Sequence, residues 1–453
     1  MIDQLLAQAR RSPSSCFLLT HDQSLTYAQA ASAARRLGSL LRRRAIERLA
    51  IHCHDSPDLV LLLGGCSAAG CEPCVLNRES SPAEIGEMLR RLEIRVVVAD
   101  ADLLIDGVEV LQIDSLVAES GSLPEAAEAT APDARLMVLT TGTTGPPKAA
   151  VYTWASLAAQ ARQRPHLAGT RWLLAYHLNH FAGLQMLLHV LANAATLVIP
   201  RSSRVADAIG AIVEQHVEYV SATPTFWRFL LAELGPDQAA ALPIRQITLG
   251  GEAVPQDLLE TLHRMFPDAR ISQVFATTEV GSCFSVRDLA AGLPASLFER
   301  TDDTGVQMKV VDGELHVRSS HGMLGYFGEA EGGGGAWRPT GDLVERRGDR
   351  FYFLGRKTET INVGGVKVHP PTIEELVQQV RGVAAVRCYG RHNPVTGQIV
   401  ALDVLPADAT DSAAIESRIR EACGGLPRHA QPRLIRFVES LETANHKLVR
   451  RIS

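Results

Sequence analysis

The sequence predicts an α/β protein of two or three domains. Its 453 residues are more than one compact domain usually holds. Up to about residue 135, short apolar runs typical of buried strands alternate with segments of helical periodicity, which favours mostly parallel sheets covered by helices. After Pro371 the order becomes helix, two strands and another helix, which favours a smaller α+β unit.

The individual elements follow from these patterns. Leucines at helical spacing predict a helix over 26–44, and residues 57–69 predict a core helix between strands at 49–51 and 95–99. Further along, we expect a strand at 136–139, a helix at 154–162, a strand entering a helix at 219–225, and a strand, tight turn and helix from 246 to 253. In the last part we expect helices at 373–381 and 413–422, with strands at 385–389 and 399–404.

Composition and charge describe an ordinary soluble protein, with 46% apolar and 21% charged residues. A net charge of −5 gives no reason to expect a nucleic-acid partner. The apolar stretch 181–200 is interrupted by Gln185, His189 and Asn193, so we expect no membrane span. No secretory signal is visible at the start of the sequence, and we therefore expect a cytoplasmic protein.

Eight cysteines are scattered along the chain. Cys71 and Cys74 have the spacing of a redox or zinc motif, but no second Cys or His pair nearby completes a site. We therefore expect free, partly buried thiols in a reducing compartment.

Residues 140–148 read Thr-Thr-Gly-Thr-Thr-Gly-Pro-Pro-Lys and follow the expected strand at 136–139. Hydroxyls, backbone N–H groups and one ammonium in such a loop suit a polyphosphate. The loop is not a Walker A motif, because Pro147 and Ala149 occupy the places of its glycine and its Ser or Thr. An ordinary turn is the alternative at this point.

The loop resembles the phosphate-binding signature T-S-G-T-T-G-x-P-K-G of adenylate-forming enzymes, the superfamily of acyl-CoA synthetases, adenylation domains and luciferases. Threonine replaces the signature's serine, and Ala149 replaces its last glycine. The resemblance implies that ATP phosphates bind at Thr140, Thr141, Gly142, Thr143, Thr144, Gly145 and Lys148.

Two later segments resemble the family's adenine and metal motifs. Gly251 and Glu252 match a G-G-E-x stretch that lines the adenine site. Residues 274–279 match Y-G-x-T-E, with an alanine at the glycine position. By this resemblance Phe275 stacks on adenine, Thr278 contacts the α-phosphate, and Glu279 binds Mg²⁺, which prefers carboxylate and phosphate oxygens.

The ribose and hinge motifs follow in the family's order. Asp342, in Trp-Arg-Pro-Thr-Gly-Asp, matches the aspartate that holds the ribose hydroxyls. Arg356 matches an arginine that reaches the ribose or phosphate, and Gly364 and Gly365 match glycines that border a ligand tunnel. Thr358 departs from the usual Asp or Lys of the hinge, although hinges need no single residue type.

Lys447 matches the family's adenylation lysine, in a basic tail that is otherwise an ordinary solvated terminus. His180 matches the histidine of P-[LM]-x-H-x-x-G, where it faces the carboxylate substrate or gates the thiol tunnel, with His177 in place of the proline. A satisfied core histidine is the alternative for His180. A zinc site at these two histidines lacks its third and fourth ligands.

The resemblance implies a large multi-subdomain N-terminal domain, 1–355, with mostly parallel sheets, and a small α+β C-terminal domain, 356–453, joined by a hinge. It also implies ATP-dependent activation of a carboxylic acid to acyl-AMP, with Mg²⁺, and transfer of the acyl group to a thiol. Positive charge from the loop, the metal and Lys447 would neutralise the attack of one anion on another.

Three readings of function remain open. The first is a CoA ligase, the second a stand-alone ligase that loads the phosphopantetheine of an acyl-carrier protein, and the third a nucleotide-binding regulatory protein without turnover. The acid is expected to be aromatic or of small to medium length. An α-amino acid is not expected, because Asn179-His180-Phe181 offers no carboxylate for its ammonium group.

Overall fold

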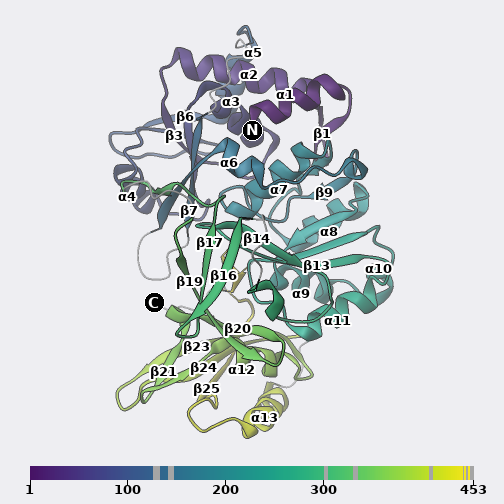
Figure 1. Ribbon diagram of the computed structural model, residues 1–453, viewed down its shortest axis with the longest axis vertical. Coiled ribbons are helices and arrows are strands. Elements are labelled where there is room, and N and C mark those ends of the chain that lie inside the picture. Colours follow the sequence, from purple (N-terminus) through teal and green to yellow (C-terminus); the bar gives the residue numbers. More distant parts are fainter. Residues whose placement is uncertain are drawn as a thin grey trace.

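The computed structural model describes residues 1–125, 133–140, 147–299, 305–329, 335–407 and 412–441, with the backbone of 443–444 and 447–448. In Figure 1 two large sheets and their helices fill the upper and middle parts, and a five-stranded sheet lies at the centre. A further sheet with its own helices forms the lower part. The mixed α/β architecture predicted from the sequence is confirmed.

The eight-stranded sheet has the order β14-β13-β12-β11-β9-β10-β1-β2. Its six inner strands run parallel, and β2 and β14 add antiparallel edges. The strands are β1 (Cys16–Leu19), β2 (Ser24–Thr26), β9 (Arg171–Leu173), β10 (Thr196–Val198), β11 (Tyr219–Ala222), β12 (Gln246–Gly250), β13 (Arg270–Thr277) and β14 (Gly281–Val286).

The seven-stranded sheet has the order β18-β8-β7-β4-β3-β5-β6. The strands from β7 to β6 run parallel, whereas β8 and β18 are antiparallel to their neighbours. The strands are β3 (Arg48–His52), β4 (Glu72–Val75), β5 (Val96–Ala99), β6 (Glu109–Gln112), β7 (Arg135–Thr140), β8 (Lys148–Thr153) and β18 (Gly325–Tyr326).

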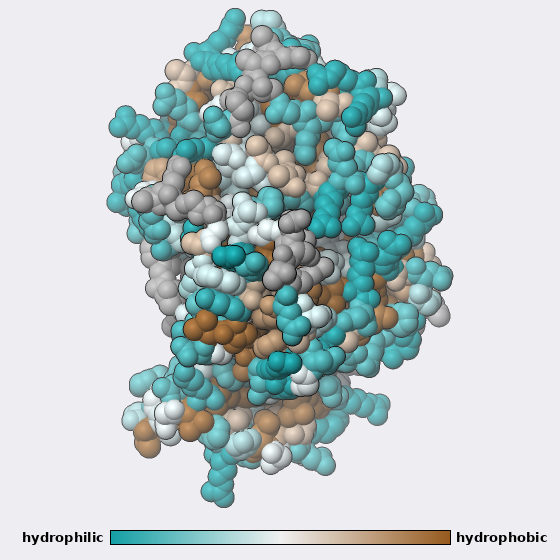
Figure 2. All heavy atoms as spheres, in the orientation of Figure 1, coloured by the Kyte–Doolittle hydropathy of each residue, from teal (hydrophilic) through white to brown (hydrophobic). Residues whose placement is uncertain are grey.

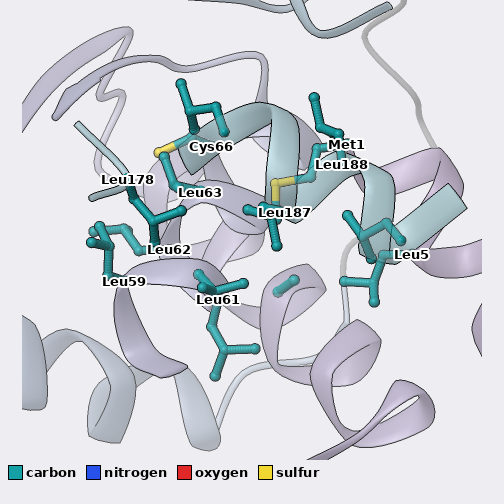
Figure 3. Packing of buried hydrophobic residues seen from close by; sticks show 14 of the residues in the cluster. Met1, Leu5, Leu59, Leu61, Leu62, Leu63, Cys66, Leu178, Leu187 and Leu188 are labelled. Carbon is teal, nitrogen blue, oxygen red and sulfur yellow. The ribbon is translucent and has the colours of Figure 1, made fainter. Parts of the chain in front are cut away.

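Buried helices join these two sheets into one core. The helix α3 (Pro57–Ala69) is apolar on all sides; the Ser56 side chain caps its first turn and Gly70 ends it with φ 77°. It packs in one cluster with α1 (Ile2–Arg11), α2 (Tyr27–Arg43) and α7 (Phe181–Ala192). Figure 3 shows leucines from α3 and α7 meeting in this cluster. The other helices that accompany the two large sheets are α4 (Pro82–Arg91), α5 (Ile113–Gly121), α6 (Trp154–Ala159), η1 (Pro165–Leu167), α8 (Val205–Glu214), α9 (Pro224–Glu233), α10 (Pro236–Ala240) and α11 (Gln256–Met265).

The five-stranded sheet, β15-β20-β19-β17-β16, is antiparallel throughout, which the βαβ pattern did not predict. Its inward residues form a separate small core. It consists of β15 (Leu293–Pro294), β16 (Val306–Val311), β17 (Glu314–Ser319), β19 (Arg338–Arg347) and β20 (Arg350–Arg356), with η2 (Ala295–Leu297) beside it. The N-terminal region thus contains two mainly parallel sheets and one antiparallel sheet.

The last part of the chain builds its own α+β core. Its sheet has the order β22-β21-β24-β23, with β25 parallel to β24. The elements are η3 (Lys357–Glu359), β21 (Ile361–Val363), β22 (Val366–Val368), α12 (Pro370–Gln378), β23 (Val383–Asn393), β24 (Gly397–Pro406), α13 (Ser412–Ala422), η4 (Cys423–Gly425) and β25 (Leu434–Phe437), then the pair β26 (Thr443–Ala444) and β27 (Lys447–Leu448).

Most element predictions are confirmed, with shifts at the ends. The helix α6 stops at Ala159 rather than 162, α11 begins only at Gln256, and α12 spans Pro370–Gln378 rather than 373–381. Within the described residues no helix is both long and apolar enough to cross a membrane.

Candidate active site

A cavity of about 2240 Å³ opens where the eight-stranded sheet, the five-stranded sheet and α12 meet. Side chains from β12 to β14, the start of α7, β19 and β20 line it, and α12 closes one side from the carboxy-terminal part. On the face shown in Figure 2, polar side chains cover most of the surface, and apolar ones gather over β16 to β20. The sequence-predicted site residues can be located relative to this cavity.

The predicted phosphate loop is framed by two paired strands. Thr140 ends β7 and Lys148 begins β8; the two residues are register partners, and both line the cavity. The Lys148 Nζ lies 3.3 Å from Glu329 Oε1 and 4.6 Å from the centre of the Tyr326 ring. The loop residues Thr141, Gly142, Thr143, Thr144 and Gly145 lie outside the described residues.

Thr278 and Glu279 follow β13 and line the same cavity. The Tyr326 hydroxyl donates to Glu279 Oε1 at 3.0 Å, and the Tyr152 hydroxyl donates to the Thr278 carbonyl at 2.7 Å. No cluster of three or more His, Cys, Asp or Glu side chains suited to a metal occurs in the described part of the chain. Mg²⁺ is usually held by one or two carboxylates together with substrate phosphate oxygens, and the Glu279 carboxylate, on the same cavity as both ends of the predicted phosphate loop, fits this ion.

Phe275 lines the cavity inside an aromatic cluster. Its ring is stacked with Phe284 at 5.3 Å and with Phe353 at 5.4 Å, with interplanar angles of 10° and 20°. The sequence analysis expected adenine as the stacking partner. In this structure protein rings already stack on Phe275, so the adenine role stays a prediction.

Asp342 and Arg356 face each other across the β19–β20 pair and line the cavity. Arg356 Nε lies 2.9 Å from Asp342 Oδ1, and its Nη1 donates to the Thr340 carbonyl at 2.8 Å. The pair places a carboxylate and a guanidinium side by side on the cavity wall. A nucleotide bound there would exchange part of this ion pair for its own contacts.

Gly251 and Glu252 also line the cavity, but the Glu252 carboxylate bonds to protein groups. It accepts from the Thr225 backbone N at 3.0 Å and from Thr225 Oγ1 at 3.1 Å. The carboxylate therefore caps the first turn of α9. Any contact between this residue and adenine would involve its backbone and that of Gly251, whose φ is 84°.

His180 is the N-cap residue of α7 and lines the cavity, as does His177. His177 Nδ1 lies 2.6 Å from Asp55 Oδ2, and Asp55 Oδ1 accepts the Leu178 backbone N–H at 3.0 Å. Helix α7 starts so close to this turn that a Cβ on Gly183 would lie 2.2 Å from the His177 carbonyl oxygen. Sequence reasoning missed Asp55, which lies 122 positions before its partner, whereas Gly183 stands at the last glycine of the P-[LM]-x-H-x-x-G motif.

Electrostatics around His177 favour its charged form. Burial lowers the pKa of His177, but the hydrogen bond and negative charge of Asp55, with a further contribution from Glu79, outweigh burial and raise it. By contrast, burial raises the pKa of the cavity-lining Cys283 thiol to about 12.

The predicted thiol-tunnel glycines lie away from the cavity in this structure. Gly364 and Gly365, with φ 60° and 88°, form the two-residue turn between β21 and β22 and are not among the residues that line the cavity. The backbone of β27, which carries Lys447, lies beside α9, whose first residues line the cavity. The side chain of Lys447 lies outside the described residues.

Comparison with known proteins identifies the family. The model of the AMP-binding enzyme family matches residues 5–327, and that of the AMP-binding enzyme C-terminal domain matches 372–447. A 2-succinylbenzoate–CoA ligase of Bacillus velezensis is 26% identical, with 95% of this chain and 96% of the relative covered. An indoleacetate–CoA ligase of Aromatoleum aromaticum is 25% identical, with 93% and 90% covered.

Solved structures share the fold over nearly the whole chain. An anthranilate CoA ligase, AuaEII, in complex with anthranoyl-AMP has a TM-score of 0.83 at 19% identity, with 99% of this chain and 95% of that one covered. The o-succinylbenzoate CoA synthetase of Bacillus subtilis with ATP and magnesium has a TM-score of 0.76 at 22% identity, with 99% and 98% covered. The matched models span most of the sequence, and the chain therefore belongs to the AMP-binding enzyme family.

Proposed function

We propose that this enzyme uses ATP to convert a carboxylic acid to acyl-AMP and then transfers the acyl group to the thiol of CoA. The single observation that carries the proposal is the cavity, on which Lys148, Glu279, Asp342 and Arg356 converge from separate elements. Family membership supports it. The relatives reported above, matched over nearly their whole length, are CoA ligases.

The chemistry requires charge neutralisation at the reacting phosphate. In the first step a carboxylate oxygen of the acid bonds to the α-phosphorus of ATP, and the bond to pyrophosphate breaks. In the second step the thiol sulfur bonds to the acyl carbon, its proton passes to solvent, and AMP leaves. Lys148 and Lys447 would stabilise negative charge in the first step. Mg²⁺, when bound at Glu279, would supply further positive charge on the phosphate oxygens.

Four further residues would bind different parts of the nucleotide and the acid. Asp342 would accept both ribose hydroxyls, Arg356 would reach the ribose or phosphate, and Thr278 would contact the α-phosphate. His180, at the start of α7, would face the carboxylate of the acid. These roles rest on the motif positions and on the fact that all four residues line one cavity.

We place the division between the two domains at residues 355 and 356. β20 ends at Arg356, the first residue of the second domain, and η3 leads from there into the carboxy-terminal sheet. The position of β27 beside α9 suits the first step, which needs Lys447, whereas the glycine turn at 364–365 lies away from the cavity. The second step would then require a rotation of the small domain that brings this turn to the thiol.

Two alternatives stand beside this proposal. In the first, the thiol acceptor is the phosphopantetheine of an acyl-carrier protein. In the second, the protein binds nucleotides without catalysing a reaction. The test is AMP release and mass spectrometry with ATP, a carboxylate panel and either CoA or a phosphopantetheinylated carrier protein. Acyl-CoA is the expected product. Acylation of the carrier protein alone would overturn the choice of acceptor, and the absence of AMP release with every acid would overturn the catalytic role. Cell fractionation tests the proposed cytoplasmic location.

A further inference from the structure

The eight-stranded sheet has one apolar and one polar face between β11 and β14, because successive side chains point to opposite faces of a strand. The apolar face belongs to a buried core beneath α9 and α11: Val220, Ala222, Ile247, Leu249 and Ile271. The alternating residues line the cavity instead: Tyr219, Ser221, Gln246, Thr248, Ser272 and Ser285. An acid with a purely apolar tail would therefore lie against hydroxyl and amide groups.

The strand register aligns these polar side chains in rows across the sheet. Trp172, Tyr219, Gln246 and Arg270 are successive partners at the amino ends of four parallel strands. Gln246 Nε2 donates to Ser272 Oγ at 2.9 Å, which holds the polar groups in place. The Trp172 and Tyr219 rings are stacked at 4.5 Å and line the same end of the cavity.

Three arginines from different elements line this end: Arg164 before η1, Arg270 at the start of β13, and Arg287 just after β14. Among the residues that the structure describes, none of the three forms an ion pair with a carboxylate. By comparison, Arg228 on the same cavity lies 3.0 Å from Asp257. Arg270 and Arg287 are exposed and Arg164 is partly exposed, so their guanidinium groups are open to solvent and available to a ligand.

Their charges also influence one another. Burial, together with the positive charges of Arg164 and Arg270, lowers the pKa of Arg287. Burial and the charge of Arg164 lower the pKa of the neighbouring His189 to about 4, so this ring is neutral at pH 7. Like charges that gather without a counter-ion raise the free energy of the folded protein, and a bound anion removes that cost.

This end of the cavity is far from the reacting centre. Arg287 follows Val286, whose register partner Gln273 on β13 lies five residues before Thr278, the residue that follows this strand. At about 3.3 Å per residue, this separation is roughly 17 Å. A group bound by the arginines therefore sits well beyond the reach of a benzoate-sized acid whose carboxylate is at Thr278.

We propose that the acid substrate is extended and carries a second anionic group, which Arg164, Arg270 and Arg287 bind at the far end of the cavity. The inference rests on the proposed acid-activating function and names its substrate class. A carboxylate or another oxyanion would accept paired N–H bonds from the guanidinium groups. The intervening chain would lie along the polar sheet face and beside the Trp172–Tyr219 stack.

The first test is pyrophosphate exchange with ATP in the absence of CoA. Dodecanedioic and hexadecanedioic acids are compared with dodecanoic and hexadecanoic acids, which have the same lengths and one carboxylate. The dianions are expected to have the lower KM. Replacing each arginine by glutamine should raise the KM for the dianions roughly tenfold or more, because a charge-assisted hydrogen bond is lost. The KM for the monoanions should change little.

Arg201→Gln is the matched control, because this exposed arginine lies outside the cavity and should leave both KM values unchanged. A calorimetric titration of each variant with hexadecanedioic acid measures binding independently of turnover. Arginine-dependent binding without exchange would support the anion site while contradicting the proposed reaction. Equal KM values for dianion and monoanion, with no effect of the three substitutions, would overturn the site. An arginine effect confined to the CoA-dependent step would instead assign the arginines to the phosphates of CoA and would also overturn it.

Discussion

The contact between Asp55 and His177 offers a sharp test of how the site is held together. Asp55 follows β3 of the seven-stranded sheet, and His177 follows β9 of the eight-stranded sheet. One carboxylate oxygen bonds to the imidazole at 2.6 Å and the other to the Leu178 backbone N–H at 3.0 Å. Asp55→Asn keeps an oxygen for the backbone bond and removes the charge that faces the ring.

The expected loss in the free energy of unfolding follows from the exposure and the charge of the Asp55–His177 pair. A hydrogen bond to a charged group contributes about 1.5–3 kcal/mol. The His177 and Asp55 side chains are 34% and 18% exposed, so solvent screening places the loss near the lower end of that range. Because the folded-state pKa of His177 is raised above 6.5, the stabilisation is complete below about pH 6.5 and is lost as the pH rises through the raised value.

Urea unfolding at about pH 6 and about pH 9 measures this difference, since a larger fraction of His177 is charged at the lower pH. The variant should be less stable than wild type at the lower pH, and the gap should narrow at the higher one. Asp102→Asn, which removes an equally negative but exposed carboxylate, should show no such pH-dependent gap. A gap of the same size at both pH values would refute the role assigned to the imidazolium.

In Asp55→Asn, the KM for the acid should also rise by a larger factor than kcat falls. The His177 carbonyl accepts the His180 backbone N–H at 3.1 Å, so a shift of this turn moves the side chain expected to face the substrate. An unchanged KM, together with the stability loss, would confine Asp55 to a structural role.

Three further substitutions test the proposed roles directly. Asp342→Ala should weaken ATP binding about 10- to 150-fold, measured by calorimetry, because a hydrogen bond to a charged group is lost; unchanged affinity would contradict the ribose role. Glu279→Gln should keep the fold, since the amide oxygen can still accept from Tyr326, but should lose Mg²⁺-dependent turnover. A wild-type metal dependence would show that the ion binds elsewhere. Lys447→Ala should slow acyl-AMP formation by roughly 10²- to 10³-fold and leave thioester formation from supplied acyl-AMP nearly unchanged, and equal losses in both half-reactions would contradict the domain rotation.

Local patterns in the sequence were sufficient to predict several elements closely. The helix predicted at 57–69 matches α3 residue for residue, because Ser56, Pro57 and Gly70 mark both of its ends. The motif residues Thr140, Lys148, Glu279, Asp342 and Arg356 all line one cavity. The antiparallel sheet was not predicted, since its strands lack the βαβ rhythm and pair through turns.

Contacts between distant residues could not be read from one sequence. Asp55 meets His177 only because two sheets pack side by side, and no pattern near either residue signals the contact. The sequence did not indicate that the three arginines at the far end of the cavity lie together. Their proximity results from the strand register and from the path of the chain before η1. Phe275 was predicted as an adenine platform, but its cross-strand neighbour Phe284 already stacks on it, a pairing set by the β13–β14 hairpin.

The burial of Cys283 has a consequence for chemical selectivity. An acyl-AMP mixed anhydride reacts with any thiolate in reach, and this cysteine lines the cavity in which the anhydride would form. Burial raises the pKa of this thiol to about 12, so at pH 7 a far smaller fraction of it is ionised than of an ordinary cysteine, which is a few per cent thiolate. Because an un-ionised thiol is a poor nucleophile, we expect acyl-AMP to react with the incoming thiol substrate rather than with Cys283.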